Sequence, residues 1–315
     1  MGTSAACGAQ TVARGQNATL GNSAIPRQVY MKEQYSIILP AKNEATALAD
    51  LLPELRRLLP GAEIIVVDDG STDDTVSVCK KYEANVISRP LSLGNGAAVK
   101  TGARAARGEY LIFMDADGQH QPKDIPRLLE MFERGYDMVV GSRTRQSQAG
   151  THRAFANAGY NRLATWMTGK KIEDLTSGFR VVNAAKFRKF LYLLPNGFSY
   201  PTTITMSFFR AGYSVGYVPI ETSPRLGKSH IRLWRDGLRF LIIIFRTCTL
   251  YSPMRLFLPV SFLFFVTGVG YYLYTFLTLH RFTNMSALLI ITSVLVFLVG
   301  LISEQITMLN YRDSE

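Results

Sequence analysis

Two long stretches without a charged side chain lie near the C-terminus, and they constrain the fold of this chain more than any other feature. Residues 256–279 form a stretch of 24 residues, and residues 285–303 form one of 19. A helix needs about 20 apolar residues to cross the hydrocarbon core of a bilayer, whereas helices of soluble domains normally carry a polar face. Because only residues 280–284 separate the stretches, the sequence predicts a transmembrane helical hairpin with a short tail over residues 255–315.

The segment before the hairpin, residues 231–254, is both basic and apolar. Arg232, Arg235 and Arg239 interleave with aliphatic side chains and with Trp234. This composition is typical of an amphipathic helix in the membrane interface, with its arginines on anionic headgroups; a solvated face of the soluble domain is the alternative. Clustered arginines favour the cytoplasmic side, so we expect the soluble domain and both termini there, at a plasma or inner membrane. The formal net charge of +11 is then largely explained by the membrane, and nucleic-acid binding loses its main support.

The residues before this segment predict a soluble α/β domain. Residues 1–30 are rich in small and polar residues and predict a disordered lead-in, so the domain spans residues 31–230. Strands are predicted at residues 35–39, 63–67, 86–88, 110–114 and 138–140, with helical periodicity between them. This alternation favours a mostly parallel sheet with helices on both faces, in which ligands bind beyond the carboxyl ends of the strands.

Polar residues directly follow four of these five strands. They occupy residues 40–44, 68–74, 115–120 and 141–143. An ordinary turn or helix cap explains one such cluster, but a parallel sheet brings all four carboxyl ends to one edge. We therefore expect a binding site at this edge.

Asp115 and Asp117 carry the most specific chemistry of these clusters. Two carboxylates at a strand end suit one Mg²⁺ or Mn²⁺ ion, which completes its shell with water and substrate phosphates. Gln119 is near enough in the sequence to add an oxygen ligand. A solvated turn is the alternative for a lone pair of aspartates, but the preceding strand and the arginine after the next strand, Arg143, favour a metal site.

Five ordered motifs within residues 35–230 resemble a known family. They are Pro40-x-x-Asn43-Glu44, Val66-Val67-Asp68-Asp69-Gly70-Ser71, Asp115-Ala116-Asp117-x-Gln119-His120, Gly141-Ser142-Arg143 and Thr176-Ser177-Gly178-Phe179-Arg180. The chain resembles family 2 glycosyltransferases of the GT-A fold and, more narrowly, polyprenyl-phosphate (dolichyl-phosphate) hexosyltransferases. The resemblance implies a GT-A catalytic domain, here residues 31–230, ahead of the interfacial segment and the hairpin.

The resemblance also implies residue roles by position. The nucleotide-sugar site would comprise Pro40, Lys42, Asn43, Glu44, Val67, Asp69, Asp115, Ala116, Asp117, Gln119 and Arg143. Asp117 and Arg143 would be catalytic, and Asp115, Asp117 and Gln119 would surround Mg²⁺ or Mn²⁺. Arg143, Arg153 and Asn157 would hold the acceptor phosphate; Arg153, Asn157 and Asn161 share one helix face because they lie four residues apart.

The chain departs from the family pattern in two places. Asn157 stands where the family more often has serine. The family often closes over the diphosphate with Arg-x-x-Gly-x-Ser-Lys, whereas this chain has Arg225-Leu-Gly-Lys228-Ser-His230, which is one residue shorter. Arg225, Lys228 and His230 are therefore all candidates for the diphosphate contact.

The resemblance implies inverting transfer of a hexose from a UDP- or GDP-linked sugar to the phosphate of a membrane polyprenol. A processive membrane polysaccharide synthase is one alternative, but neither Trp166 nor Trp234 lies in the Gln-x-x-Arg-Trp motif of such enzymes. A non-catalytic membrane scaffold is another, but it would be expected to have lost the paired aspartates or the arginines. Because a two-helix hairpin buries few of its own surfaces, self-association in the membrane is compatible with the sequence, which leaves the oligomeric state open.

Overall fold

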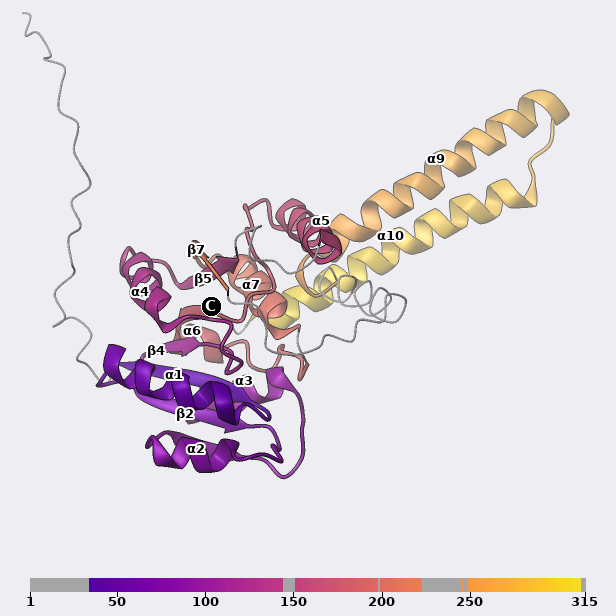
Figure 1. Cartoon of the computed structure of the whole chain (residues 1–315). Coiled ribbons are helices and arrows are strands. Elements are labelled where there is room, and N and C mark those ends of the chain that lie inside the picture. The colour runs from indigo at the N-terminus through magenta and orange to yellow at the C-terminus, as the bar shows by residue number, and fades with distance from the viewer. Residues whose placement is uncertain (1–33, 144–150, 198, 223–244, 246–248, 313–315) are drawn as a thin grey trace, which may run out of the picture.

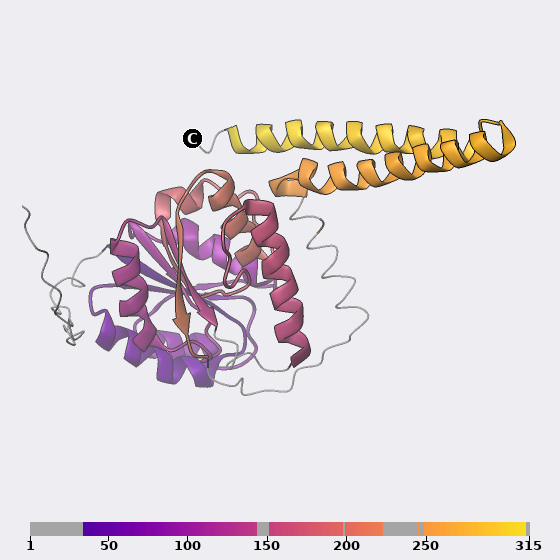
Figure 2. The same ribbon diagram turned by 90° about the horizontal axis from the view of Figure 1, so that it is seen from above.

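The computed structural model of the chain describes residues 34–143, 151–197, 199–222, 245 and 249–312, and for residues 151–158 it describes the backbone alone. The predicted lead-in (residues 1–30), most of the interfacial segment (231–254), and Arg225, Lys228 and His230 lie outside the described residues. Figures 1 and 2 show two parts, an α/β domain and a long helical hairpin that projects away from it.

The α/β domain is built on a seven-stranded sheet with the strand order β3-β2-β1-β4-β6-β5-β7. The strands are β1 (Tyr35–Ala41), β2 (Glu63–Asp68), β3 (Asn85–Ser88), β4 (Tyr110–Phe113), β5 (Met138–Arg143), β6 (Arg180–Asn183) and β7 (Val215–Ile220). Only β6 runs antiparallel to its neighbours β4 and β5. The sheet is therefore mostly parallel, as predicted, and the carboxyl ends of β1, β2, β4 and β5 lie at one edge.

Helices cover both faces of this sheet because successive side chains of a strand point to opposite faces. Ile37 and Leu39 of β1 join one buried cluster with helices α1 and α4, while Ile38 joins a second cluster with α3, α6 and α7. The helices are α1 (Ala45–Leu58), α2 (Thr75–Lys81), α3 (Asn95–Ala105), α4 (Ile125–Glu133), α5 (Thr151–Thr168), α6 (Ala184–Arg188) and α7 (Tyr200–Arg210). Figure 2 shows the strands between these helical layers.

Strands β6 and β7 were not predicted from the sequence. β6 has only four residues, and β7 contains both a glycine and a proline. Neither gives a long β-branched run, so their pairing depends on the strands beside them.

The hairpin consists of α9 (Pro253–Leu279) and α10 (Asn284–Tyr311). Both helices are long and apolar enough to cross a membrane, and only 11% and 17% of their most apolar windows are buried. A core helix of a soluble domain would be mostly buried, so their exposed apolar faces agree with the predicted hairpin. α10 continues eight residues beyond the uncharged stretch that ends at residue 303, through Glu304 to Tyr311.

Small side chains at seven-residue spacing form the contact between α9 and α10. The buried residues of this seam are Ser261, Gly268 and Thr275 on α9, and Ser286, Ser293 and Gly300 on α10. One step further along α10, Thr307 donates a hydrogen bond of 3.0 Å to Thr249 O, ahead of α9. Ser261 and Ser293 each donate a hydrogen bond of 2.9 Å to the other's carbonyl oxygen. A Cβ at Gly300 would lie 2.7 Å from the Cβ of Phe257. Small residues thus let two apolar helices approach closely without a hydrophobic driving force.

Candidate active site

The polar clusters at the carboxyl edge line a cavity of about 450 Å³. Its lining consists of Pro40, Ala41, Lys42, Glu44, Asp69, Ser92, Gly94, Asn95, Ala98, Asp115, Ala116 and Asp117. The structure therefore brings together seven of the eleven described residues that the sequence predicted for the nucleotide-sugar site. Ser92, Gly94, Asn95 and Ala98 were missed, although a glycine-containing turn before a helix is a recognisable sequence signal.

A second cavity of about 310 Å³ adjoins the first and shares Asn95 and Asp115 with it. Its other lining residues are Arg143, Tyr160, Thr176, Gly178, Ser199, Tyr200, Pro201 and Thr202. Asp115 therefore stands between the two cavities, with the β1 and β2 loops on one side and with β5, α5 and α7 on the other. This junction suits a reaction between two substrates.

Asn43, Val67 and Gln119 do not line either cavity. Asn43 adopts a left-handed backbone with φ of 56°, and its side-chain oxygen accepts a hydrogen bond of 2.7 Å from the Thr72 N–H. It thereby joins the loops after β1 and β2. Val67 is fully buried in the core, because its side chain points to the sheet face that α3 covers. The Gln119 N–H donates to Asp117 Oδ1 at 3.2 Å.

The carboxylate of Asp69 organises the rim of the first cavity. It accepts hydrogen bonds from Leu93 N–H and Gly94 N–H, both at 2.9 Å, and from Ser92 Oγ at 2.7 Å. Arg89 forms an ion pair with it at 3.0 Å. Burial would raise the pKa of Asp69, but these hydrogen bonds and the charge of Arg89 outweigh burial and hold the pKa below its ordinary value. Asp69 therefore positions the loop before α3.

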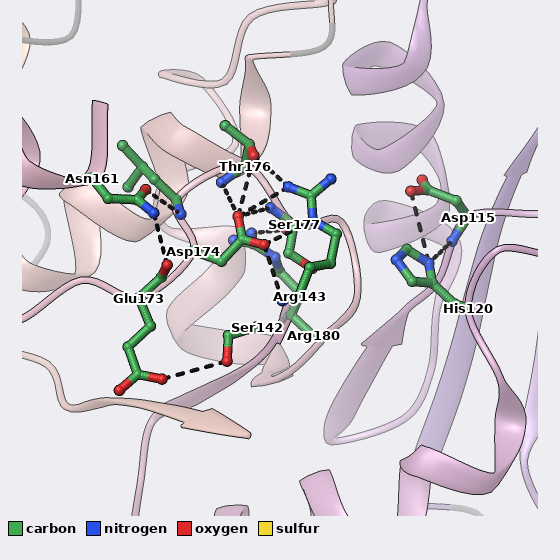
Figure 3. A network of polar contacts seen from close by, with 11 residues as sticks. Asp115, His120, Ser142, Arg143, Asn161, Glu173, Asp174, Thr176, Ser177 and Arg180 are labelled. Atoms are coloured by element: carbon green, nitrogen blue, oxygen red, sulfur yellow. Dashed lines mark hydrogen bonds and ion pairs between the residues drawn. The ribbon is translucent and has the colours of Figure 1, made fainter. Parts of the chain in front are cut away.

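His120 and Gly178 determine the position of Asp115. Its N–H donates to His120 Nδ1 at 3.4 Å, and the His120 ring stacks on Phe179 at 5.2 Å between centroids. A Cβ at Gly178 would lie 2.8 Å from Asp115 Oδ2. Only glycine at position 178 leaves the Asp115 carboxylate in its place. Figure 3 shows Asp115 and His120 beside the network that surrounds Arg143.

Arg143 is held by a buried carboxylate that the sequence did not nominate. Its Nε and Nη2 donate to Oδ2 and Oδ1 of Asp174 at 2.8 and 3.0 Å, and Nη2 also donates to Thr176 Oγ1 at 2.5 Å (Figure 3). Burial would raise the pKa of Asp174, but the hydrogen bonds and charge of Arg143 outweigh burial and lower it. The pair lies 31 residues apart in the chain, so no local pattern pointed to Asp174.

The donor set is suitable for a single hard cation. Among the described residues, no three His, Cys, Asp or Glu side chains gather as a metal cage. Mg²⁺ and Mn²⁺ need fewer protein ligands, since one or two carboxylates with water and substrate phosphates suffice. Asp115 and Asp117 line the same cavity, and Gly178 keeps space for the Asp115 carboxylate. These two aspartates therefore fit such an ion.

The predicted acceptor residues Arg153 and Asn157 lie in α5, but their side chains lie outside the described residues. Later in the same helix, Tyr160 lines the second cavity. Asn161 does not extend the predicted phosphate-binding stripe. Its side chain donates to Glu173 O at 2.7 Å and accepts from Leu175 N–H at 3.1 Å, so it fixes the backbone on both sides of Asp174, the partner of Arg143 (Figure 3).

The chain is similar to several known proteins. An undecaprenyl-phosphate mannosyltransferase of Micrococcus luteus is 33% identical over 210 residues, which cover 61% of this chain and 85% of that protein. A dolichyl-phosphate hexose transferase of Haloferax volcanii is 25% identical over 222 residues, 70% of this chain and 96% of that protein.

The fold is similar to that of glucosyl-3-phosphoglycerate synthase from Mycobacterium tuberculosis, crystallised with Mn²⁺ and UDP-glucose. The TM-score is 0.57 and the sequence identity is 20%, over 68% of this chain and 79% of that chain. This likeness supports the GT-A fold and no more. Residues 252–309 match the GtrB C-terminal hairpin, and residues 36–191 match Glycosyl transferase family 2. With its sheet, its paired aspartates and these relatives, the chain belongs to glycosyl transferase family 2 and has the GT-A fold followed by a GtrB-type hairpin.

Proposed function

We propose that this protein transfers a hexose from a UDP- or GDP-linked sugar to the phosphate of a membrane polyprenol, with inversion at the anomeric carbon. The observation that carries the proposal is the combination, in one chain, of a carboxylate-lined cavity of glycosyl transferase family 2 with a GtrB-type hairpin. The relatives named for undecaprenyl-phosphate and dolichyl-phosphate sugar transfer support the same acceptor class.

The first cavity is the proposed donor site. We assign Lys42 and Glu44 to the nucleoside, and Asp115 and Asp117 to the diphosphate, because all four line this cavity and Asp115 also borders the second one. A divalent ion on these aspartates would stabilise the charge that grows on the departing nucleoside diphosphate. Arg143, which Asp174 holds in a fixed orientation, supplies a second positive charge without having to reorganise during the reaction.

The second cavity is the proposed meeting place of hexose and acceptor phosphate. A phosphate monoester is already largely ionised near neutral pH, because its second pKa is about 6. It therefore needs positioning more than deprotonation, and we assign this task to Arg143, Arg153 and Asn157. An acceptor oxygen forms the new bond to the anomeric carbon while the bond to the nucleoside diphosphate breaks. One direct displacement of this kind inverts the anomeric configuration.

The membrane arrangement follows from the hairpin and the basic segment before it. We propose that α9 and α10 span the membrane, that residues 231–254 lie in the cytoplasmic interface, and that the α/β domain and both termini are cytoplasmic. An even number of spans returns the chain to its starting side, and the arginines of the interfacial segment favour the cytoplasmic leaflet.

The test uses the full-length protein in liposomes with Mg²⁺ or Mn²⁺, a panel of UDP- and GDP-sugars, and polyprenyl phosphate. We expect one lipid product, a polyprenyl-phosphate hexose with inverted anomeric configuration, identified by mass spectrometry and NMR. Asp117→Asn serves as the inactive control. A polysaccharide product would support the processive alternative, and no product with any donor would support the scaffold.

A further inference from the structure

Helix α7 extends from the second cavity to the base of the membrane hairpin. Its first residues, Tyr200, Pro201 and Thr202, line the cavity, and its last residue, Arg210, contacts the hairpin. Residues 200–208, nine of its eleven residues, are buried. Eleven residues at 1.5 Å each give α7 a length of about 16 Å, so it connects the two regions directly. Figure 1 shows α7 next to the start of α9 and the end of α10.

At the hairpin end, Arg210 makes an ion pair with Glu304, the only charged residue within α10. Arg210 Nη2 lies 2.9 Å from Glu304 Oε1, with side-chain exposures of 20% and 15%. Arg210 Nη1 also donates to Tyr251 O at 2.6 Å, and the Met254 N–H approaches Glu304 Oε2 at 3.4 Å. A carboxylate in a membrane helix is costly unless it has a partner, so this pair specifies where the hairpin meets the domain.

A second contact fixes the rotation of α10 against α7. The Tyr311 hydroxyl lies 3.0 Å from Ser207 Oγ, and the Tyr311 ring packs into the buried cluster beside Phe190. The ring also lies 5.9 Å from the Arg210 guanidinium. The final turn of the second hairpin helix is therefore part of the core of the α/β domain.

At the cavity end, a fully buried arginine joins α7 to the loop beside Asp115. Arg180 Nη1 donates to Pro201 O and to Thr205 Oγ1, both at 3.2 Å, and Nη2 donates to Ser177 O. Ser177 precedes Gly178, where an added Cβ would lie 2.8 Å from Asp115 Oδ2. A continuous set of packed and hydrogen-bonded groups thus runs from Glu304 through α7 to the junction of the two cavities.

We propose that α7 acts as a rigid spacer that fixes the height and tilt of the second cavity relative to the membrane, and that Arg210 and Glu304 are positioning residues for transfer to a membrane-bound acceptor. This inference rests on the proposed function. The headgroup layer is only about 5–7 Å thick on each side of a bilayer, so a small tilt of the domain on its hairpin moves the cavity away from the lipid phosphate. The nucleotide sugar arrives from water and does not depend on this tilt.

The first test compares two acceptors in the full-length protein, a long-chain polyprenyl phosphate in phosphatidylglycerol-containing liposomes and a short, water-soluble polyprenyl phosphate. For Glu304→Gln and Arg210→Gln we expect kcat/KM with the long acceptor to fall ten- to a hundredfold, because small misplacements cost that much. The KM for the donor and kcat/KM with the short acceptor stay within about twofold of the parent values. The double exchange Arg210→Glu with Glu304→Arg restores most of the long-acceptor rate.

The matched control is Glu130→Gln, which removes an exposed ion pair of 2.8 Å with Arg134 in the same domain. We expect it to leave both acceptors unaffected. If Glu304→Gln lowers kcat/KM equally with both acceptors, the Arg210–Glu304 ion pair acts on the stability of the protein as a whole, and the proposal is overturned. Unchanged use of both acceptors would overturn it as well.

A second readout needs no transfer activity. The chain has two tryptophans, and Trp166 is 53% exposed beside the hairpin, where Arg255 Nη1 donates to its carbonyl oxygen at 2.9 Å. In a Trp234→Phe background, quenching of Trp166 by lipids brominated at known depths reports the height of the domain. We expect Glu304→Gln to shift or broaden the depth profile. An unchanged profile overturns the spacer, whereas failure of the parent to use either acceptor contradicts the proposed function alone.

Discussion

The donor side and the acceptor side of this protein are built in different ways. The donor cavity lies over β1, β2 and β4, and most of its polar groups come from short loops that directly follow these strands, with Ser92 and Asn95 added from the segment after β3. The acceptor side lies over the end of β5 and the start of β6. Its key contacts join distant parts of the chain: Arg143 with Asp174, 31 residues apart, and Arg210 with Glu304, 94 residues apart. The donor side is thus built within residues 40–117, whereas the acceptor side depends on later parts of the chain and on the membrane hairpin.

The comparison predicts that damage to the donor side stops transfer to every acceptor, whereas damage to the acceptor side depends on which acceptor is offered. The following predictions test this distinction, from the largest effect to the smallest.

Loss of the metal site gives the largest effect. Asp117→Asn, or excess EDTA with the parent protein, should lower turnover by two to three orders of magnitude, as expected when a group that stabilises developing charge is removed. The loss is the same for long and short acceptors, because the donor is affected. Membrane insertion and thermal unfolding of Asp117→Asn are the controls. Full activity in excess EDTA would contradict the prediction.

Gly178→Ala tests the junction of the two sides. The added Cβ would lie 2.8 Å from Asp115 Oδ2, so the carboxylate must rotate away. Because the obstacle is the end of a side chain, we expect the melting temperature to change little while turnover falls on the order of a hundredfold.

The matched control is Gly159→Ala, where a Cβ would have no neighbour within 4 Å. Normal turnover of Gly178→Ala at saturating Mn²⁺, with an unchanged metal affinity, would show that Asp115 tolerates the displacement.

Arg153→Ala separates the two sides by kinetics. If Arg153 binds the acceptor phosphate, its loss removes a charge-assisted hydrogen bond worth about 1.5–3 kcal/mol, and kcat/KM for polyprenyl phosphate falls roughly ten- to a hundredfold. The affinity for the nucleotide sugar, measured by calorimetry, stays near the parent value. An equal loss of affinity for the nucleotide sugar would show that Arg153 contacts the donor instead.

The smallest effect concerns acid stability of the donor side. The pKa of Asp69 is lower in the folded protein than its ordinary value, so its ionised form stabilises the fold. That contribution is complete above the unfolded-state pKa of about 3.9 and is lost as the pH falls through the lower folded-state pKa. We expect the difference in melting temperature between the parent and Asp69→Asn to narrow below pH 4. A constant difference from pH 6 to pH 2 would show that Asp69 acts without its charge.

The sequence by itself determined the local features of this protein. The uncharged stretches predicted the hairpin, and the polar residues after β1, β2 and β4 predicted the donor site, because a parallel sheet always brings these strand ends to one edge. The resemblance to the family added roles for Lys42, Glu44 and Asp115, all of which line the donor cavity. It also nominated Val67, which the structure places in the core.

Tertiary structure alone decided the rest. Asp174 carries no motif of its own and becomes important only because the fold buries it against Arg143. Asn161 has the spacing of a phosphate-binding stripe, but its carboxamide is hydrogen-bonded to the backbone of the loop at residues 173–175. In the sequence, Glu304 is a single charged residue at the end of an apolar stretch. Only the fold shows that Arg210 of α7 forms an ion pair with it. The physical reason is common to all three: sequence periodicity indicates which face of an element is buried, whereas the partner of a polar or charged side chain is determined by the tertiary fold.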